Sequence, residues 1–276
     1  MECLFQRHWH ILVRRQGEQS LWAETVYHDT IHDLVAGMQV NIRSFVIEQA
    51  QWEQHRPVVP DAEELRAVPE LSGIEAYFSS GAQVSRALAP YGETLMGQLF
   101  AETVKGVIQA ESFIFKERGY QTAEDYSRAW RDFYTGSCRY YSNLDRVRQE
   151  WYQHVGTTTR AGILFSRFIA QTLYRVSSER LLLQGTFNDS FHELAVSIEL
   201  DAANRRVEEI SGRLLRCPDQ VCREATFFLP ELKGTKLEDL SKKEIAGCLG
   251  RNQGCVHLID LTFDLAYTLK LAEQVL

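Results

Sequence analysis

The chain has 276 residues, of which 45% are hydrophobic and 24% are charged, and its formal net charge is −7. This composition is that of a globular protein with room for two ordinary domains, and the acidic balance argues against nucleic acid as a partner, because phosphate binding needs a concentrated basic face. No apolar stretch approaches the roughly 18 residues of a membrane span, and the first residues lack the apolar core of a secretory signal. We therefore expect a cytoplasmic protein without membrane contact.

Two parts of the chain share a pattern at a constant spacing. The segment HDTIHDL at 28–34 resembles NDSFHEL at 188–194, and the same spacing pairs Ile47-Glu48 with Val207-Glu208. After small insertions the match continues from PELSG at 69–73 to PELKG at 230–234. Such self-similarity indicates an internal duplication. We expect a degenerate N-terminal repeat over 1–113, a helical connector over 114–163 and a C-terminal repeat over 164–276.

The first repeat and the connector predict different elements. His32, Leu34, Ala36, Met38 and Val40 alternate with other residues and mark one face of a strand in the first repeat. The connector predicts one helix over 122–135, whose start resembles a capping box, and a second helix over 142–154. Its many aromatic residues need burial, so we expect it to pack on the domains.

The second repeat predicts four strands followed by helices. The strands are expected over 166–175, 181–188, 192–200 and roughly 206–215, and the third has strict alternation of apolar and more polar residues. After Pro218 the pattern changes to short helices near 219–229 and 237–247 and a long amphipathic helix over 258–276. The fold class is therefore α+β, a tandem duplication of an antiparallel four-stranded meander followed by helices.

The C-terminal repeat also carries residues that could hold a metal. His192 starts one predicted strand and Cys217 ends the next, so an antiparallel pair would place them at one sheet edge. The last helix could bring Cys255 and His257 to the same edge. Thiolate and neutral imidazole are good ligands for zinc or iron, and we predict a metal site formed by His192, Cys217, Cys255 and His257.

Both the choice of ligands and the presence of a metal leave alternatives. Residues two positions apart face apart on a regular helix, so Cys255 and His257 share an ion only if Cys255 lies in the preceding turn. Otherwise one of the two does not bind the ion, and Cys222 and Cys248 are the reserve ligands. Cysteine is also a common buried residue. In the first repeat, His32 is present although the positions that match Cys217 and Cys255 are occupied by Pro57 and Glu93. The alternatives are a metal-free interaction module and a metalloenzyme with an open coordination position, in which Glu193 or Asp189 would be the general base.

Three short motifs of the second repeat resemble known proteins. His192-Glu-Leu, Arg216-Cys217-Pro218 and Gly254-Cys255-Val-His257-Leu258 resemble an uncharacterised bacterial family of unknown function with a closing G-C-x-H-L motif. More distantly, Cys217 after the last strand and the Cys255 to His257 helix start resemble NifU-type iron–sulfur cluster assembly scaffolds, although the first cysteine of those proteins has no counterpart here.

The second resemblance implies metal or cluster handling without catalysis. The expected function is a non-catalytic metal-binding protein that carries zinc or iron, as an ion or a small cluster. Its expected partner is the metal ion, and a protein partner is a further alternative. The degenerate repeat would make the chain an intramolecular pseudo-dimer, and a homodimer of chains is a further alternative.

Overall fold

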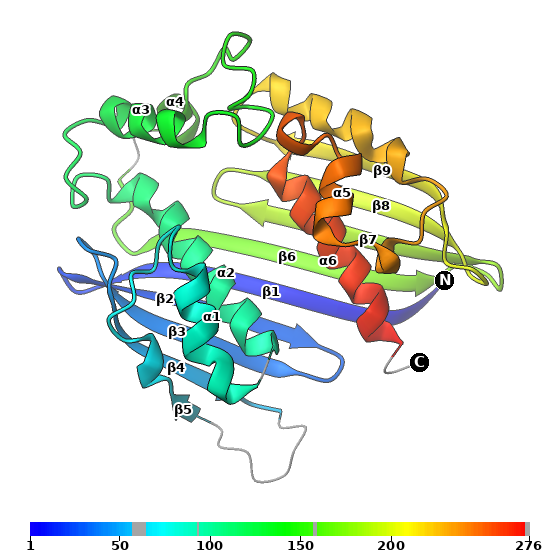
Figure 1. The fold of residues 1–276 in the computed structure, drawn as a ribbon, viewed down its shortest axis with the longest axis horizontal. Coiled ribbons are helices and arrows are strands. Elements are labelled where there is room, and N and C mark those ends of the chain that lie inside the picture. The colour runs from blue at the N-terminus through cyan, green and yellow to red at the C-terminus, as the bar shows by residue number, and fades with distance from the viewer. Residues whose placement is uncertain (57–64, 93, 157–158, 274–276) are drawn as a thin grey trace. The chain divides into compact units, whose positions relative to one another are not determined.

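The computed structural model describes residues 1–56, 65–92, 94–156 and 159–273 (Figure 1). The chain divides into two compact units whose ranges alternate along the sequence. The N-terminal unit consists of Trp9–Tyr126 and Thr157–Phe168, and the C-terminal unit consists of Met1–His8, Ser127–Gly156 and Ile169–Leu276. The mixture of strands and helices is α+β, as predicted.

The strands are antiparallel neighbours in one hydrogen-bonded order. The described residues form nine strands in the order β5-β4-β3-β2-β1-β6-β7-β8-β9. Their bounds are β1 Glu2–Gln16, β2 Ser20–Asp29, β3 Asp33–Asn41, β4 Ile47–Gln54, β5 Leu65–Ala67, β6 Ile163–Arg175, β7 Arg180–Asp189, β8 Glu193–Asp201 and β9 Val207–Arg216. The prediction of four strands for each sheet was wrong, because β1 and β6 are also neighbours. The first strand of a meander leaves a row of unpaired backbone groups, and pairing with another strand satisfies them.

The strand pairs within the two meanders have matching registers. Ser20 faces Asn41 across β2 and β3, and Arg180 faces Asp201 across β7 and β8 at the corresponding place. Both meanders have a register shift near the end of their third strand. Phe45 and Arg205, in the turns that follow, have positive φ angles of 57° and 58°. The spacing that links the two repeats in the sequence therefore also links their backbone irregularities.

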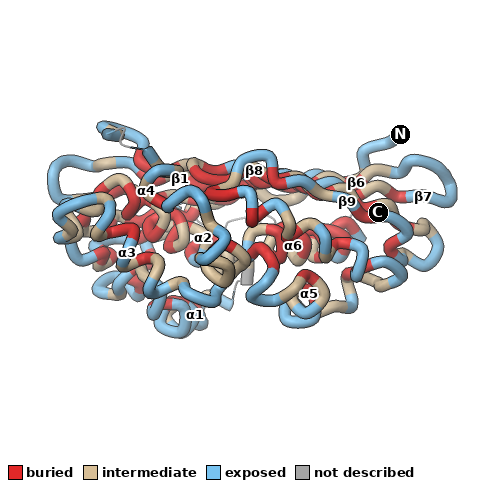
Figure 2. Tube along the Cα trace, turned by 90° about the horizontal axis from the view of Figure 1, so that it is seen from above, coloured by how far each residue is buried: buried red, intermediate tan, exposed pale blue. Residues whose placement is uncertain are grey.

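The α-helices are α1 Gly81–Leu88, α2 Thr94–Ala110, α3 Ala123–Tyr134, α4 Trp151–Val155, α5 Lys242–Cys248 and α6 Val256–Ala272. In each unit one long helix lies over a face of the strands, α2 over β2 and β3 and α6 over β7 and β8 (Figures 1 and 2). The 3-10 helices are η1 Pro69–Leu71, η2 Ala89–Tyr91, η3 Glu111–Phe113, η4 Gln220–Leu232, η5 Leu237–Asp239 and η6 Arg251–Gln253. Among the described helices, none is long and apolar enough to cross a membrane.

The long helix of the second repeat packs closely on β7. Leu258, Leu261, Leu265 and Leu269 of α6 are all buried, as their spacing predicts. Gly185 of β7 lies beneath them, and a Cβ atom there would come within 3.0 Å of Leu261 and of Leu265. The missing side chain of Gly185 therefore lets α6 approach the sheet.

Three sequence predictions of local structure need correction. The second connector helix is only α4, because residues 142–150 form turns in which Arg148 and Gln149 donate their backbone N–H groups to the Asp219 carboxylate at 2.8 and 3.0 Å. The helix expected near 219–229 is the 3-10 helix η4, and Pro230 lies inside it. His192 precedes β8 and does not start it. Residues 57, 93 and 274–276, which the predictions also touched, lie outside the described ranges.

Candidate metal centre

The turn between β7 and β8 is built around the carboxylate of Asp189. Its Oδ1 accepts the backbone N–H groups of Phe191 and His192 at 2.8 and 2.7 Å, and the same oxygen lies 3.3 Å from Nδ1 of the His192 ring. Asp189 and His192 are only 4% and 8% exposed. An aspartate side chain that accepts the backbone N–H groups of the residues two and three positions later stabilises a local turn. It explains why His192 has a buried and oriented ring before the strand begins.

His257 reaches the same place from the start of α6. The ring centroids of His192 and His257 lie 4.0 Å apart, and Phe187 of β7 borders His257 at 5.0 Å. One ligand atom from each of Asp189, His192 and His257 lies within 4.8 Å of the other two. We call these three residues the Asp-His-His group. Two imidazoles and one carboxylate form a donor set that zinc and iron(II) accept in proteins.

The helix α4 of the connector borders the Asp-His-His group. The ring of Trp151 lies 6.2 Å from that of His192, and the ring of His154 lies 6.5 Å from it. Nε2 of His154 lies 2.8 Å from the carbonyl oxygen of Phe191. Because a carbonyl only accepts, Nε2 carries a proton. Burial lowers the pKa of His154, which favours the neutral ring with Nδ1 unprotonated.

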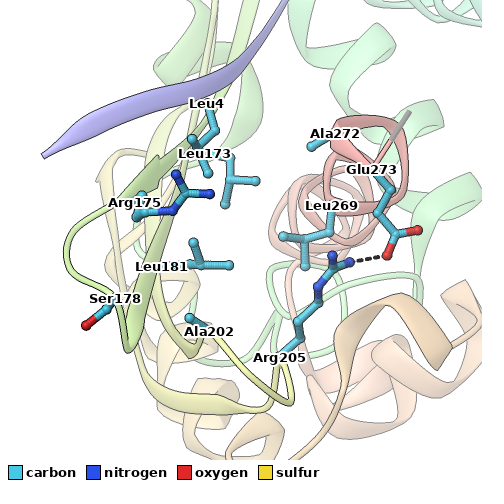
Figure 3. A pocket seen from close by; sticks show the side chains of 10 residues that line it. All are labelled: Leu4, Leu173, Arg175, Ser178, Leu181, Ala202, Arg205, Leu269, Ala272 and Glu273. Carbon is cyan, nitrogen blue, oxygen red and sulfur yellow. Dashed lines mark hydrogen bonds and ion pairs between the residues drawn. The ribbon is translucent and has the colours of Figure 1, made fainter. Parts of the chain in front are cut away.

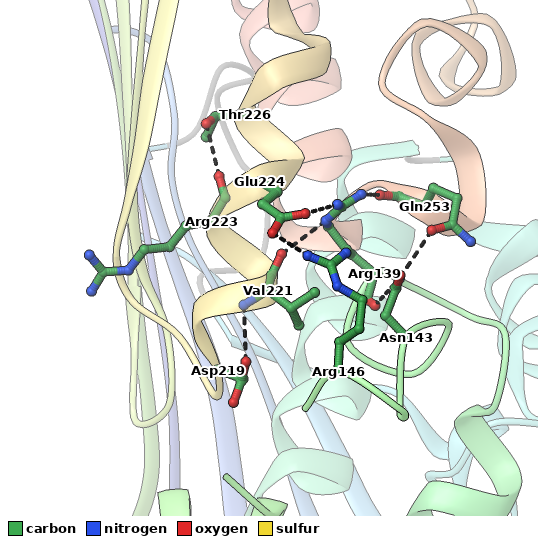
Figure 4. A network of polar contacts seen from close by, with 9 residues as sticks. All are labelled: Arg139, Asn143, Arg146, Asp219, Val221, Arg223, Glu224, Thr226 and Gln253. Carbon is green, nitrogen blue, oxygen red and sulfur yellow. Dashed lines mark hydrogen bonds and ion pairs between the residues drawn. The ribbon is translucent and has the colours of Figure 1, made fainter. Parts of the chain in front are cut away.

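The segment before α4 is tied to η4 by the polar contacts drawn in Figure 4. Arg139 donates to the carbonyl oxygens of Val221 and Gln253 at 2.9 and 3.0 Å and pairs with Glu224. Arg146 also pairs with Glu224. Together with the bonds to Asp219, these contacts hold the connector where Trp151 and His154 border the group. The sequence predicted a packed connector but not this placement.

Cys217 lies directly after β9, as predicted, but its main contact is another cysteine. The Cys222 thiol donates to the Cys217 sulfur, and this bond lowers the pKa of Cys217 to about 6, against the opposing effect of burial and with help from Arg223. The same bond and burial raise the pKa of Cys222 above its usual range. Cys217 therefore loses its proton more readily than Cys222 does.

Cys255 is the residue that precedes α6 and has an extended backbone, with φ −106° and ψ 123°. It therefore meets the condition that it lie in the turn before the helix. It is nevertheless buried, and burial raises its pKa to about 12. A buried thiol in an apolar setting keeps its proton, and the protonated form is a poor metal ligand.

The structure thus brings together two of the four residues predicted from the sequence. In the described part of the chain, His192 and His257 share a group with Asp189, and Cys217 and Cys255 are not members of it. Asp189 was considered only as a general base. The signal that could have found it is its position three residues before His192, where an aspartate closes a turn and also reaches the histidine ring. Whether the residues bind a metal stays a prediction.

The first repeat contains an incomplete copy of this arrangement. Asp29 Oδ1 accepts the N–H groups of Ile31 and His32 at 2.7 and 2.6 Å and lies 3.1 Å from Nδ1 of His32. The other carboxylate oxygen accepts the Tyr27 hydroxyl at 2.6 Å. Leu95 is the second residue of α2, as His257 is of α6. The first repeat therefore has the aspartate and one histidine, with a leucine in place of the second.

A separate cavity of 310 Å³ lies at the C-terminal end of α6 (Figure 3). Leu4, Leu173, Leu181 and Leu269 form most of its apolar wall. Its two arginines are both paired, Arg175 with Glu2 and Arg205 with Glu273. The cavity shares no lining residue with the Asp-His-His group.

These features define the class as an α+β protein with two meanders of matching register, of which the second carries the Asp-His-His group. Residues 174–270 match the sequence model of a family described as a protein of unknown function, DUF2889. This match covers the second repeat from the end of β6 into α6 and supports the predicted likeness to an uncharacterised family. No curated protein and no solved structure gives a significant match. The likeness to NifU-type scaffolds stays a prediction.

Proposed function

We propose that the C-terminal unit binds one divalent transition metal ion, zinc or iron(II), through His192, His257 and Asp189, and that the protein is a metal-binding protein. The proposal depends on one observation, the convergence of three ligand atoms within 4.8 Å of one another. Two of these residues were predicted as ligands from the sequence. Their rings come from separate elements, the turn before β8 and the start of α6.

The hydrogen bonds of the group suggest how the histidines would bind. Because Nδ1 of His192 faces Asp189, its Nε2 is the nitrogen available to an ion. A histidine that bonds to a carboxylate through one nitrogen and to a metal through the other is a common arrangement, since the carboxylate sets the tautomer and the ring orientation. Asp189 would then either orient His192 or bind the ion through its second oxygen.

The competing interpretation is a hydrogen-bonded core without a metal. Asp189 and His192 already bond to each other, and the first repeat holds the matching Asp29 and His32 without a second histidine. The difference between the repeats is His257. A metal-free core would gain little from a second imidazole beside His192, whereas a metal site needs it as a ligand.

The test is metal content and titration. Protein purified anaerobically would be analysed for zinc and iron, and the chelator-treated protein would be titrated with each ion by calorimetry. We expect one ion per chain in the wild type and none in His257→Ala. His32→Ala, in the first repeat, is the matched control and should bind as the wild type does. Equal metal content in His257→Ala and the wild type would overturn the proposal.

We also infer that the chain arose by duplication and that the first repeat is a degenerate, metal-free partner of the second. The matching registers of the two meanders and the shared Asp29–His32 and Asp189–His192 turns support this inference. An ion bound by the first repeat would contradict this inference. The metal titration of His257→Ala would then still show one bound ion.

A second candidate function is a metalloenzyme, and the number of ligands favours it. Three protein ligands leave a coordination position for water, which is the arrangement of catalytic zinc sites. Absorption spectra of the cobalt(II)-loaded protein at rising pH would test it. A spectral transition near neutral pH would report ionisation of a bound water, and its absence would favour a closed site with a further ligand. Reconstitution with iron and sulfide would test cluster handling, since a cluster colours the protein brown.

A further inference from the structure

We propose that Cys217 and Cys222 form a reversible redox pair, which a low-molecular-weight disulfide oxidises to an intramolecular disulfide bond. The structural reason is that one turn brings their two thiols into contact, outside the Asp-His-His group. The pair is a chemical site of its own, and it does not depend on the metal proposal.

The turn from 217 to 222 is organised around Asp219. The carbonyl oxygen of Asp219 accepts the backbone N–H of Cys222 at 3.1 Å and the thiol of Cys217 at 3.2 Å. The Asp219 side chain accepts the N–H of Val221 at 3.0 Å and so begins η4. Pro218 restricts the backbone between them. Both cysteines are thereby held against the same carbonyl group, and their side chains hydrogen bond to each other.

The two sulfurs have different environments, which assign them different roles. Cys217 is partly exposed, and the guanidinium of Arg223 also donates to its sulfur. Cys222 is 7% exposed. A partly exposed sulfur next to a cation and a hydrogen-bond donor attacks as the thiolate, whereas a buried protonated thiol reacts only with a neighbour. Cys217 is therefore the attacking thiol and Cys222 the resolving thiol.

The chemistry proceeds in two exchange steps. The Cys217 thiolate attacks one sulfur of the small disulfide, a mixed disulfide forms, and one small thiolate leaves. That thiolate takes the proton of Cys222, whose sulfur then attacks the Cys217 sulfur and expels the second small thiolate, which takes up a proton from solvent. In total the two protein thiols lose two electrons and two protons, and the small disulfide is reduced to two thiols.

The sequence offers a direct assay. Trypsin cleaves after Arg216 and Arg223, so one peptide, Cys217–Arg223, carries both cysteines. Reduced full-length protein would be treated with chelator and equilibrated in buffers of rising glutathione disulfide to glutathione ratio. Acid quenching, alkylation of free thiols, digestion and mass spectrometry follow. We expect a peptide two hydrogens lighter than the dithiol form and without alkyl groups, and a reductant should restore the dithiol.

Single variants separate the two roles. Cys222→Ser should stop at the mixed disulfide, so its peptide carries glutathione on Cys217. Cys217→Ser should leave Cys222 reduced. Cys248→Ser is the matched control on α5 and should oxidise as the wild type does. Circular dichroism would establish that each variant is folded.

The wild-type result alone can overturn the proposal. A peptide that keeps two alkyl groups at every glutathione ratio excludes the redox pair, as does a wild type that accumulates glutathione on Cys217 as persistently as Cys222→Ser. Because the metal has been removed, neither outcome depends on the Asp-His-His group. A failure of metal binding would likewise leave this result unchanged.

Discussion

The rings of His192 and His257 lie 4.0 Å apart between centroids, although one belongs to the turn before β8 and the other to the start of α6. The turn positions His192 through Asp189, and the packing of α6 on β7 positions His257. The candidate centre therefore joins a local hydrogen-bonded turn to a long-range helix contact.

Asp189→Asn tests how the carboxylate takes part in metal binding. Asparagine keeps an oxygen that can accept the N–H groups of Phe191 and His192, so the turn should survive. A residue that orients a ligand typically changes metal affinity by about 10–100-fold. We expect a loss of that size, measured by calorimetry. Asp29→Asn in the first repeat should have no effect, and an equal loss in that control would contradict the assignment.

Tyr27→Phe tests the matching turn of the first repeat. Burial alone would raise the pKa of Asp29, but the bonds from Tyr27 and from the backbone of His32 and Ile31 outweigh it, so the pKa is lowered. Such a group stabilises the fold above the ordinary aspartate pKa of about 4, and this stabilisation is lost as the pH falls through the lower folded value.

The variant should therefore lose about 1 kcal/mol of unfolding free energy at pH 7, and the loss should shrink in acid. Urea unfolding at several pH values between neutral and acid measures it. A loss that stays constant across the series would show that the carboxylate is not involved.

The reactivity of Cys217 should depend on pH with a midpoint near its pKa of about 6. The thiolate is the form that reacts with iodoacetamide, so the alkylation rate should rise as the pH increases through this value. Cys222→Ala removes the first cause of the low pKa, the thiol that donates to Cys217, and should move the midpoint upward. Mass spectrometry of the Cys217–Arg223 peptide follows the rate. The same midpoint in both proteins would refute the donor role.

Two glycines of the C-terminal unit should respond to alanine in opposite directions. In β9, a Cβ at Gly212 would lie 2.8 Å from the Leu229 side chain and 3.0 Å from the Ala195 carbonyl oxygen, so Gly212→Ala should destabilise by about 1–3 kcal/mol. In α5, a Cβ at Gly247 meets nothing within 4 Å, and Gly247→Ala should stabilise by roughly 0.5–1 kcal/mol. Thermal or urea unfolding compares them, and a shared sign would contradict the packing.

The elements that the sequence predicted correctly are those whose sequence pattern lies within the element itself. The alternation of Leu194, Val196, Ile198 and Leu200 predicted β8, and the leucine spacing predicted α6, because each pattern repeats with the period of its own element. The helix predicted over 142–154 forms only from Trp151 onward, because the N–H groups of Arg148 and Gln149 bond to a distant carboxylate. A helical pattern does not reveal such a competing partner.

The same division holds at the candidate centre. His192 and His257 were identified from their residue type and position, and they do meet. Cys217 and Cys255 were equally suitable ligands by residue type. In the structure, however, Cys217 contacts Cys222, and Cys255, the residue before α6, is buried away from the group. Residue type alone cannot rank four candidate ligands, because membership is decided by where each side chain points.

The sequence by itself determined the α+β class, the long last helix and the repetition of the 28–34 segment at 188–194. These follow from periodicity and from self-similarity along the chain. Only the tertiary structure decided that β1 and β6 are neighbours and that His257, rather than a cysteine, joins Asp189 and His192. Those outcomes depend on contacts between elements far apart in the chain, which side-chain volume and packing select and which local spacing does not encode.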